Sequence, residues 1–534
     1  MPASQLFYYS SKLDTTLQPL PTAWTDDGTG PKSLILDVSP GAISNLEGSK
    51  NSCLRHAEVL AETGESTVVA KPCGRGPGSV YQGPAEVDFF EAVNFLRRQF
   101  SIDEDRISVM GGSMGGAATW YLASHYPDFF AAAAPFCGYC DYRHWPKPGG
   151  TVMRTQEWEH ASWQSRSAVF RAGNLSNTSL WIVHGEWDDS IGGGVPVQHS
   201  RNMSRLLTNL GIEHRYTEVP ECGHGCMRPE ILEEVLPWLS QQERARPTAV
   251  DLTAHTLRHN RSHFVQIDAF AIYGQPACLR AALDENALRV SAVENVRQFS
   301  LGPLDVQNVG ISIAGADLGE FDLSTPKSFE LKEGGWMRGT NAEDEDRSPH
   351  KWHGCSGPIG DIFFKPVLVV QGTQGSAHEN FVLDWLCPFW VSSFKQHNGG
   401  VHRGVFPGES HYEIRVVKDT EVTDEELERH NLILAGSANS NSVVERIRNE
   451  LPLSVGQETL NLCDQEIAGD IGAVAVSPSP FNKGRVVVNV AGTSPEALTG
   501  SSHLNFQLLP DYLVWEKEQV QHGFFDENWQ LYES

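Results

Sequence analysis

Ser113, Asp188 and His224 stand in the sequence contexts that nucleophilic catalysis at a carbonyl requires. Ser113 is the central residue of the G-x-S-x-G sequence at 111–115, Asp188 follows a short apolar run, and His224 lies between two glycines. A serine hydroxyl attacks a carbonyl when a histidine takes its proton and a carboxylate orients that histidine. The residue types and their order along the chain therefore predict a Ser-His-Asp triad.

The stretch around Ser113 predicts the strand, tight turn and helix that would position this serine. Residues 107–110 are apolar with β-branched members, as in a buried strand, and residues 117–125 have helical composition. Glycines let the chain fold back where a Cβ at Gly111 or Gly115 would collide with neighbouring backbone. The Met114 N–H would then lie at the helix N-terminus, where developing negative charge is stabilised.

The predicted acid and base both follow strands. Residues 180–183 (LWIV) form a buried-strand run before Asp188, and residues 215–220 (RYTEVP) alternate before His224. The carboxyl ends of parallel strands meet at one edge of an α/β sheet, where functional side chains gather. We therefore expect the loops that carry the two residues to converge.

These motifs resemble those of the α/β-hydrolase superfamily over residues from about 30 to 240. The resemblance is to the branch with prolyl oligopeptidase-type catalytic domains, dienelactone hydrolases and related esterases, and its motifs are GGSMGG, HGEWD at 184–188 and GHG at 223–225. It implies a mostly parallel sheet flanked by helices, with Ser113 as nucleophile, Asp188 as the orienting acid and His224 as general base. It implies no metal and no cofactor.

Two departures from this family concern the acid and the oxyanion hole. Residues 190–194 (SIGGG) lengthen the loop after the acid, so Asp189 is an alternative to Asp188. Where relatives often carry His-Gly after an early strand, this chain has LILDVSPG at 34–41. We expect the oxyanion donors to be the Met114 N–H and one N–H from the loop at Ser39.

Four aromatic or polar residues are candidates for the substrate pocket. Tyr81 and Gln82 lie on a turn-rich loop after a predicted strand, and loops on that face line the site in α/β sheets. Trp145 and Trp158 lie in an insert at 141–178, a position where the resemblance implies a cap over the site. Core packing inside the cap is the alternative for both tryptophans.

The rest of the chain divides by composition. We expect an α/β-hydrolase domain at 1–244, a β-rich, sandwich-like module at 245–345 and a smaller α/β domain at 346–534. The last domain has no serine elbow, its glycine-rich turns match no nucleotide-binding motif, and His411 has no partner motif. We expect residues 245–534 to make homo-oligomer contacts, to limit access to the site or to present the enzyme to a partner.

Charge and hydropathy exclude several classes of partner. The chain of 534 residues has a formal charge of −26 and no basic stripe, which argues against nucleic acid. It has no run of 18 apolar residues, which argues against a membrane span. Its first residues carry no export signal, so the cytoplasm is the default, and the periplasm or the exterior applies if a leader has been removed.

Ten cysteines in this length form no small disulfide scaffold. Four of them lie near the predicted site, and four thiols could bind zinc. Free buried thiols, or one bridge, are the simpler expectation. The four are Cys137, Cys140, Cys222 and Cys226.

The sequence therefore predicts a serine hydrolase that needs no cofactor. A carboxylesterase acting on small-molecule or carbohydrate-linked esters is the first expectation, and a prolyl oligopeptidase-like peptidase is the second. A catalytically silent binding protein on a hydrolase fold is the alternative from another class, against which the intact triad counts.

Overall fold

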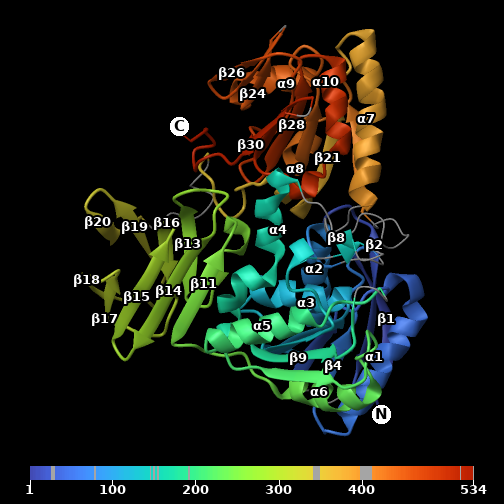
Figure 1. Cartoon of the computed structure of the whole chain (residues 1–534), viewed down its shortest axis with the longest axis vertical. Helices are drawn as coiled ribbons and strands as arrows, with labels where there is room; N and C mark the ends of the chain where they lie inside the picture. Colours follow the sequence, from blue (N-terminus) through green and yellow to red (C-terminus); the bar gives the residue numbers. More distant parts are fainter. Residues whose placement is uncertain are drawn as a thin grey trace.

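The computed structural model describes the chain except residues 26–29, 77–79, 145, 148–150, 153–155, 190–192, 341–348, 397–411, 457, 518 and 533–534. Three groups of elements follow one another in sequence and lie side by side in space (Figure 1). The first group, blue to light green, carries a mixed sheet with helices on both faces. A β-rich group in green and yellow lies beside it, and the last group, orange to red, lies above both.

An eight-stranded sheet organises the first group, in the order β1-β2-β4-β3-β5-β6-β9-β10. The strands from β4 to β10 are parallel, whereas β1 and β2 form an antiparallel hairpin that extends one edge. The strand bounds are β1 (Ala3–Ser10), β2 (Leu17–Trp24), β3 (Lys32–Asp37), β4 (Thr67–Ala70), β5 (Ile102–Gly112), β6 (Ala132–Phe136), β9 (Ser179–Gly185) and β10 (Arg215–Val219).

Helices bury apolar faces on both sides of this sheet. Buried residues of α1 and α6 pack on one face together with Ile35, Val69 and Met110 of the strands. Buried residues of α2, α3 and α5 pack on the other face. The bounds are α1 (Leu46–Ala61), α2 (Pro84–Gln99), α3 (Met114–His125), α4 (His160–Arg166), α5 (Gln198–Asn209) and α6 (Pro229–Gln241), and a short hairpin, β7 (Pro146–Lys147) and β8 (Thr151–Val152), lies in the predicted cap.

The β-rich group consists of two five-stranded sheets that share one apolar core. Residues 287–300, which read as one β-rich run, form two strands that belong to different sheets. The chain turns between them at Asn295, whose φ of 55° is one that asparagine tolerates. The strands are β11 (Ala249–Ala254), β12 (Arg261–Ser262), β13 (Val265–Phe270), β14 (Ala277–Asp284), β15 (Ala287–Glu294), β16 (Val296–Leu301), β17 (Val309–Ile313), β18 (Ala316–Phe321), β19 (Lys327–Lys332) and β20 (Gly335–Arg338).

The last group is built on a seven-stranded sheet in the order β22-β21-β23-β28-β27-β29-β30, with β24, β25 and β26 in a separate small sheet. From β22 to β28 the strands are parallel, and the others are antiparallel. The strands are β21 (Val367–Gln371), β22 (Arg415–Lys418), β23 (Asn431–Ala435), β24 (Leu453–Val455), β25 (Thr459–Leu462), β26 (Gln465–Ala468), β27 (Gly472–Pro478), β28 (Val486–Gly492), β29 (Tyr512–Glu516) and β30 (Gln519–Gly523).

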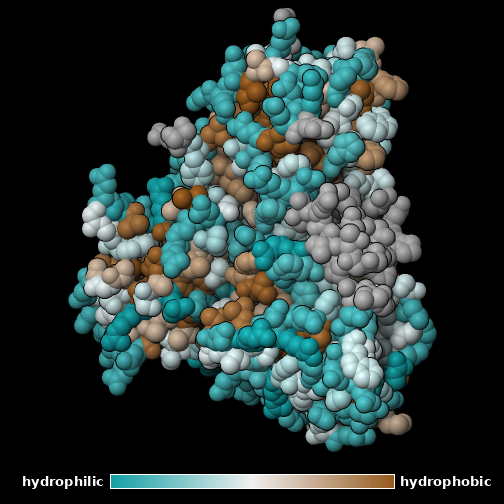
Figure 2. Space-filling model, viewed as in Figure 1, coloured by the Kyte–Doolittle hydropathy of each residue, from teal (hydrophilic) through white to brown (hydrophobic). Residues whose placement is uncertain are grey.

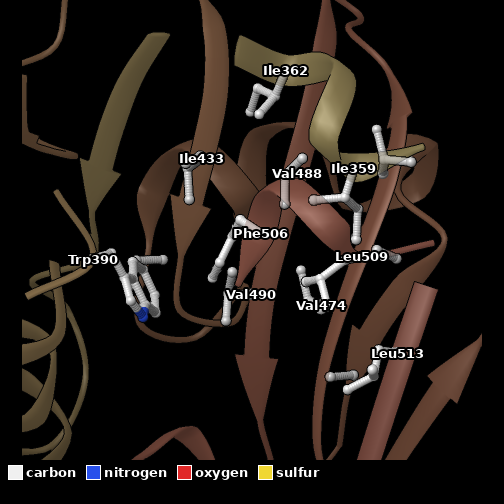
Figure 3. Close-up of a cluster of buried hydrophobic side chains, with 14 of the residues drawn as sticks. Ile359, Ile362, Trp390, Ile433, Val474, Val488, Val490, Phe506, Leu509 and Leu513 are labelled. Atoms are coloured by element: carbon white, nitrogen blue, oxygen red, sulfur yellow. The ribbon is translucent and has the colours of Figure 1, made fainter. Parts of the chain in front are cut away.

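Apolar side chains from this sheet and from α7 form a dense core, in which Trp390 and Phe506 lie beside Ile433 and Val490 (Figure 3). The helix α7 continues through Pro388, although proline usually interrupts a helix. The helices are α7 (Ala377–Gln396), α8 (Asp424–Arg429), α9 (Ser442–Ile447) and α10 (Pro495–Thr499).

Hydrophilic residues cover most of the face drawn in Figure 2, and hydrophobic residues show there as separate small areas. Among the helices that the structure describes, none has both the length and the apolar character needed to cross a bilayer.

Candidate active site

The turn between β5 and α3 places Ser113 at the carboxyl end of a central strand. Ser113 has φ 61° and ψ −118°, a conformation that costs free energy for any residue with a Cβ. Its N–H donates a hydrogen bond of 2.9 Å to the carbonyl of Phe136, at the end of the neighbouring strand β6. The elbow expected from GGSMGG is therefore present.

The glycines of the elbow are required by close approaches of backbone to backbone. A Cβ on Gly111 would lie 2.8 Å from the carbonyl carbon of Gly115. A Cβ on Gly115 would lie 2.6 Å from the Cα of Ser39 and from the carbonyl oxygen of Val38. These distances are shorter than van der Waals contact, so the predicted steric role of Gly111 and Gly115 is confirmed.

Ser113, His224 and Asp188 form one chain of hydrogen bonds. The His224 Nε2 lies 2.8 Å from the Ser113 Oγ, and the His224 Nδ1 lies 2.8 Å from the Asp188 Oδ2. The parallel pairing of β9 with β10 sets Gly185 beside Val219, so the loops that follow the two strands leave the sheet together. The expected convergence of hydroxyl, imidazole and carboxylate is therefore seen in the geometry.

Asp188 is buried and held by donors besides His224. Its Oδ1 accepts the N–H of Val195 at 3.1 Å, and its Oδ2 lies 3.1 Å from the Nε2 of His184. Burial alone would raise the pKa of Asp188, but hydrogen bonds with His184 and His224 outweigh it and hold that pKa below its usual value. The carboxylate is thus ionised at neutral pH, as the acid of a triad must be.

His184 is a supporting residue to which the sequence reasoning gave no role. It is fully buried at the end of β9, and its Nδ1 lies 2.7 Å from the Oγ of Ser200. Its place in the HGEWD motif, four residues before the acid, is the signal that could have revealed it.

Although the loop after the acid is lengthened, Asp188 and not Asp189 is the carboxylate that contacts His224. Asp188 is 3% exposed, whereas Asp189 lies on the surface. Gly194 closes the loop through an N–H that donates to the Asp189 carbonyl at 2.9 Å. A Cβ on Gly194 would collide with the Asp188 carboxylate, so this glycine lets the loop pack against the acid.

The two predicted oxyanion donors have different surroundings. Met114 is the first residue of α3, where a backbone N–H has no acceptor within the helix. The Ser39 N–H, in contrast, donates at 2.9 Å to the Oδ1 of Asp37 in its own loop. This N–H is therefore already committed, and the prediction that it binds the oxyanion is corrected. The Ser39 hydroxyl instead accepts the N–H of Gly112 at 3.0 Å, which braces the elbow.

The described substrate candidates lie in packed surroundings. Tyr81 is 2% exposed in the core beneath α2, and its hydroxyl donates to the carbonyl of Pro72 at 2.5 Å. Gln82 is 1% exposed and accepts a hydrogen bond of 2.8 Å from Arg166. Trp158 packs on the core of the last group of elements. The burial of Tyr81 and Gln82 contradicts their assignment to substrate, whereas the role of the half-buried Trp158 stays a prediction. Trp145 and His411 lie outside the described residues.

The four cysteines near the site do not share one centre. Cys137, after β6, is bridged to Cys226, two residues beyond His224, while Cys140 and Cys222 are free and buried. Among the described residues, a cluster of metal-ligand type comprises Cys137, Asp188 and His224. Its atoms are already engaged in the bridge and in the triad, so the bridge expected as one alternative is present and a four-thiol site is not.

The last group of elements contributes to the wall of the site. Leu508 lies in a small buried apolar cluster with Met114 and Ala117 at the start of α3. Arg166 of α4 donates to the carbonyl of Gln507 at 2.6 Å, which fixes this contact. No sequence signal links residue 508 to the elbow, because the contact joins parts of the chain almost four hundred residues apart.

Comparisons with known proteins place this geometry in a class. The model of the prolyl oligopeptidase family matches residues 84–243. The parallel sheet, the elbow and this match define a serine hydrolase of the α/β-hydrolase superfamily, in the branch of prolyl oligopeptidase-type domains and related esterases. The β-rich sheets and the second α/β sheet follow this hydrolase unit in the chain.

Three curated relatives match part of this chain. The chain is 34% identical over 28% of its length to an uncharacterized secreted protein of Arthroderma benhamiae, of which the match covers 16%. It is 24% identical over 39% of its length to acylamino-acid-releasing enzyme 1 of Oryza sativa subsp. japonica, covering 29% of it. It is 25% identical over 36% of its length to an esterase of Mycobacterium tuberculosis, covering 48% of it. The chain thus spans less than half of each relative.

Solved structures resemble the chain over a similar share. A thermostable esterase gives a TM-score of 0.36 at 22% identity and covers 45% of this chain and 63% of its own. An acylaminoacyl peptidase of Pyrococcus horikoshii gives a TM-score of 0.36 at 16% identity, covering 46% of this chain and 42% of its own.

Proposed function

We propose that this protein cleaves carboxylic esters through an acyl-enzyme on Ser113, with His224 as general base and Asp188 as the acid that orients it. The observation that carries the proposal is the pair of 2.8 Å hydrogen bonds that link the three side chains. The esterase of Mycobacterium tuberculosis, 25% identical over the matched region, supports an ester substrate.

The geometry suggests the order of events. The His224 Nε2 takes the proton of the Ser113 hydroxyl while its oxygen attacks the ester carbonyl. The ionised Asp188 stabilises the imidazolium and keeps Nδ1 protonated. The imidazolium then gives the proton to the departing alcohol oxygen as the carbon–oxygen bond breaks, which leaves the acyl group on Ser113. A water molecule, deprotonated by His224, then attacks the acyl carbonyl. The bond between the acyl carbon and the Ser113 Oγ breaks as the imidazolium returns the proton to that oxygen, which releases the carboxylic acid and restores the triad.

The negative oxygen of each tetrahedral intermediate needs a donor next to the nucleophile. The Met114 N–H at the start of α3 is placed for this, because it follows Ser113 directly and has no acceptor in the helix. One such donor lowers the barrier by about 3 kcal/mol.

A prolyl oligopeptidase-like peptidase is the second candidate, favoured by the family match and by the acylamino-acid-releasing relative. Its chemistry uses the same triad and differs in the leaving group, an amine instead of an alcohol. A single panel separates the two: p-nitrophenyl acetate, p-nitrophenyl butyrate and aminoacyl-p-nitroanilides, each with the wild type and Ser113→Ala.

The expected result is turnover of the p-nitrophenyl esters that is lost in Ser113→Ala. Faster turnover of the anilides than of the esters would favour the peptidase. A fluorophosphonate probe should label Ser113. Absence of both labelling and turnover would favour a catalytically silent binding protein; one mouse relative is named inactive dipeptidyl peptidase 10.

A further inference from the structure

A pocket of about 830 Å³ with both polar and apolar walls opens between α1, α6 and the carboxyl ends of β3 and β4. Its volume lies within the range of small-molecule sites in proteins. None of the side chains that the triad mechanism uses lines it, so the pocket needs a separate explanation.

Two residues that line this pocket lie against Gly112, which directly precedes the nucleophile in the sequence. Ser39 and Met227 both line it, and their side chains touch, with the Ser39 Oγ 3.8 Å from the Met227 Sδ. The Ser39 Oγ accepts the N–H of Gly112, and a Cβ on Gly112 would lie 3.3 Å from the Met227 Sδ. The pocket wall at Ser39 and Met227 therefore packs against Gly112, the residue that precedes the nucleophile.

The inner wall of the pocket carries polar groups with unused hydrogen-bonding capacity. The Lys71 ammonium makes one hydrogen bond among the described residues, at 3.4 Å to the buried Asp37 carboxylate, although it has three donors. His56 is 6% exposed, and its buried Nδ1 has no hydrogen-bond partner within the described part of the chain. A buried polar group without a partner is costly, and native proteins rarely leave one without a reason.

The charged groups that line the pocket are of both signs, which argues against a ligand with a net charge. Asp37 and Lys71 already pair with each other, and burial lowers the pKa of His56, so this ring is neutral near pH 7 and offers one donor and one acceptor. Further out, the pocket is lined by Arg55 and by carboxylates of both helices, such as Glu58. Groups of both signs, with a neutral imidazole between them, suit hydroxyls, which donate and accept at once.

The remaining wall is apolar and comes from both helices. Val59 of α1 and Leu232 of α6 line the pocket, together with Met227 and two prolines, Pro229 and Pro237. Such a surface packs against C–H groups. A ligand with hydroxyls on its edge and C–H groups on its faces, as in a sugar ring, matches both kinds of wall.

We propose that this pocket binds the hydroxylated alcohol part of the ester, a sugar unit whose acyl group is attached to Ser113 during the reaction. The proposal rests on the ester hydrolysis proposed above and adds the class of alcohol. It gives His56 and Arg55 a role in binding, and Met227 a position between the pocket and Gly112 of the elbow.

The test compares two esters that share one acyl group and differ in the alcohol. The acyl group is the one that gives the highest kcat/KM among p-nitrophenyl esters, and the second substrate is its 6-O-ester of glucose. Turnover of the p-nitrophenyl ester tests the proposed function by itself, so failure of the ester chemistry is distinguished from failure of the pocket assignment.

His56→Leu is the most informative variant, because it removes a ring whose buried Nδ1 makes no hydrogen bond to the described protein. Losing one ligand hydrogen bond should raise KM for the glucose ester about fivefold relative to KM for the p-nitrophenyl ester. Arg55→Ala, at the exposed mouth, should shift the ratio in the same direction. His255→Leu is the matched control, since this half-buried histidine also has a buried ring nitrogen, Nε2, without a partner among the described residues but lies in the β-rich group. It should leave the ratio unchanged.

Competition supplies a second readout that does not depend on the glucose ester being cleaved. Methyl glucoside should inhibit hydrolysis of the p-nitrophenyl ester by the wild type competitively, and less so in His56→Leu. Equal KM shifts for both esters in His56→Leu, or no inhibition by the glucoside, would overturn the proposal while leaving the ester hydrolase standing.

Discussion

The eight-stranded and the seven-stranded sheet both carry glycine-rich turns after their parallel strands, but the polar groups at these two edges are arranged differently. At the first sheet the turn after β5 leaves Ser113 at a strained φ of 61°, with its hydroxyl bonded to a half-exposed imidazole. The Met114 N–H next to it has no acceptor in its helix. The polar groups at this edge are therefore available to a reacting group.

At the second sheet the corresponding polar groups bind one another. Asp419 accepts the hydroxyl of Thr373 at 2.6 Å and the N–H of Ser442 at 2.7 Å. The Asn441 side chain caps α9 and also donates to the carbonyls of Val370 and Ala435, the latter the last residue of β23. Donors and acceptors are thus satisfied internally, and the edge is closed.

The comparison shows that an α/β topology provides a sheet edge at which a site can form, but that the topology alone does not make this edge reactive. Reactivity at the first edge depends on a residue held in a strained conformation and on donors left without acceptors. The second edge has the same kind of strands and turns, but its asparagine and aspartate serve as caps and braces.

The largest difference between the two edges should follow from removing a serine at each. Ser113→Ala should lower kcat/KM for p-nitrophenyl acetate by about 10⁴-fold or more, because the nucleophile is lost. Ser437→Ala, in the turn after β23, should keep wild-type turnover. Ester hydrolysis and fluorophosphonate labelling measure both. Wild-type rates in Ser113→Ala would mean that the first edge is not the reactive one.

Replacing one glycine by alanine in each turn should have a smaller effect than removing the serine, and the effect should differ between the two turns. Gly115→Ala should lower kcat by about 10²-fold, because its Cβ would lie 2.6 Å from backbone at Ser39 and must displace the elbow. Gly436→Ala, where φ is +109°, should cost about 1–3 kcal/mol of stability without changing kcat. Thermal unfolding and initial rates check the pair, and a Gly115→Ala enzyme with full kcat would contradict the steric account of the elbow.

The bridge between Cys137 and Cys226 provides a weaker test, since it restrains only the loop of the general base. Reduction, or Cys226→Ser, should lower kcat/KM by about tenfold, because His224 lies two residues away and would lose its fixed position. Cys387→Ala in α7 should have no kinetic effect, since that cysteine is free. Rates that are the same with and without reductant would show that the triad holds this loop unaided.

The smallest effect concerns the contact between the first and the last group of elements. There Arg75 pairs with Asp14 at 2.7 Å and lies over the ring of Tyr412. Burial raises the pKa of Asp88, nearby on α2, to about 6. The folded protein therefore binds this proton more tightly than the unfolded chain, and stability falls as pH rises from about 4 to about 6.

Asp88→Asn should remove that penalty. The variant should be more stable than the wild type by about 2 kcal/mol near pH 7, and the gain should vanish near pH 4. Thermal melts at the two pH values measure the difference. A gain for Asp88→Asn that is equal at both pH values would rule out proton linkage at Asp88.

The parts of this molecule that sequence reasoning could predict are those with local causes. The elbow follows from glycines adjacent to Ser113, and the positions of Asp188 and His224 follow from the strands that precede them. The hairpin β1–β2 gave no usable signal, because Pro19 and Pro21 interrupt the pattern of a strand that is nonetheless buried.

Features that depend on distant contacts could not be predicted. The Ser39 N–H was a reasonable oxyanion donor by position, but it bonds to Asp37 because the loop turns back on itself. Tyr81 and Gln82 lie on the expected loop, yet packing against α2 and Arg166 removes them from solvent. Side-chain burial of this kind is decided by partners far away in the chain.

The contact of Leu508 with the start of α3 has a practical consequence for anyone dividing this chain into pieces. A fragment that ends near residue 244 would keep the three reacting groups but would bare the apolar cluster around Met114 to water. Such a fragment would be prone to aggregate, and the surroundings of its active site would differ in shape from those of the full chain. The C-terminal third therefore belongs in any fragment intended to keep the helix that follows the nucleophile in its packed surroundings.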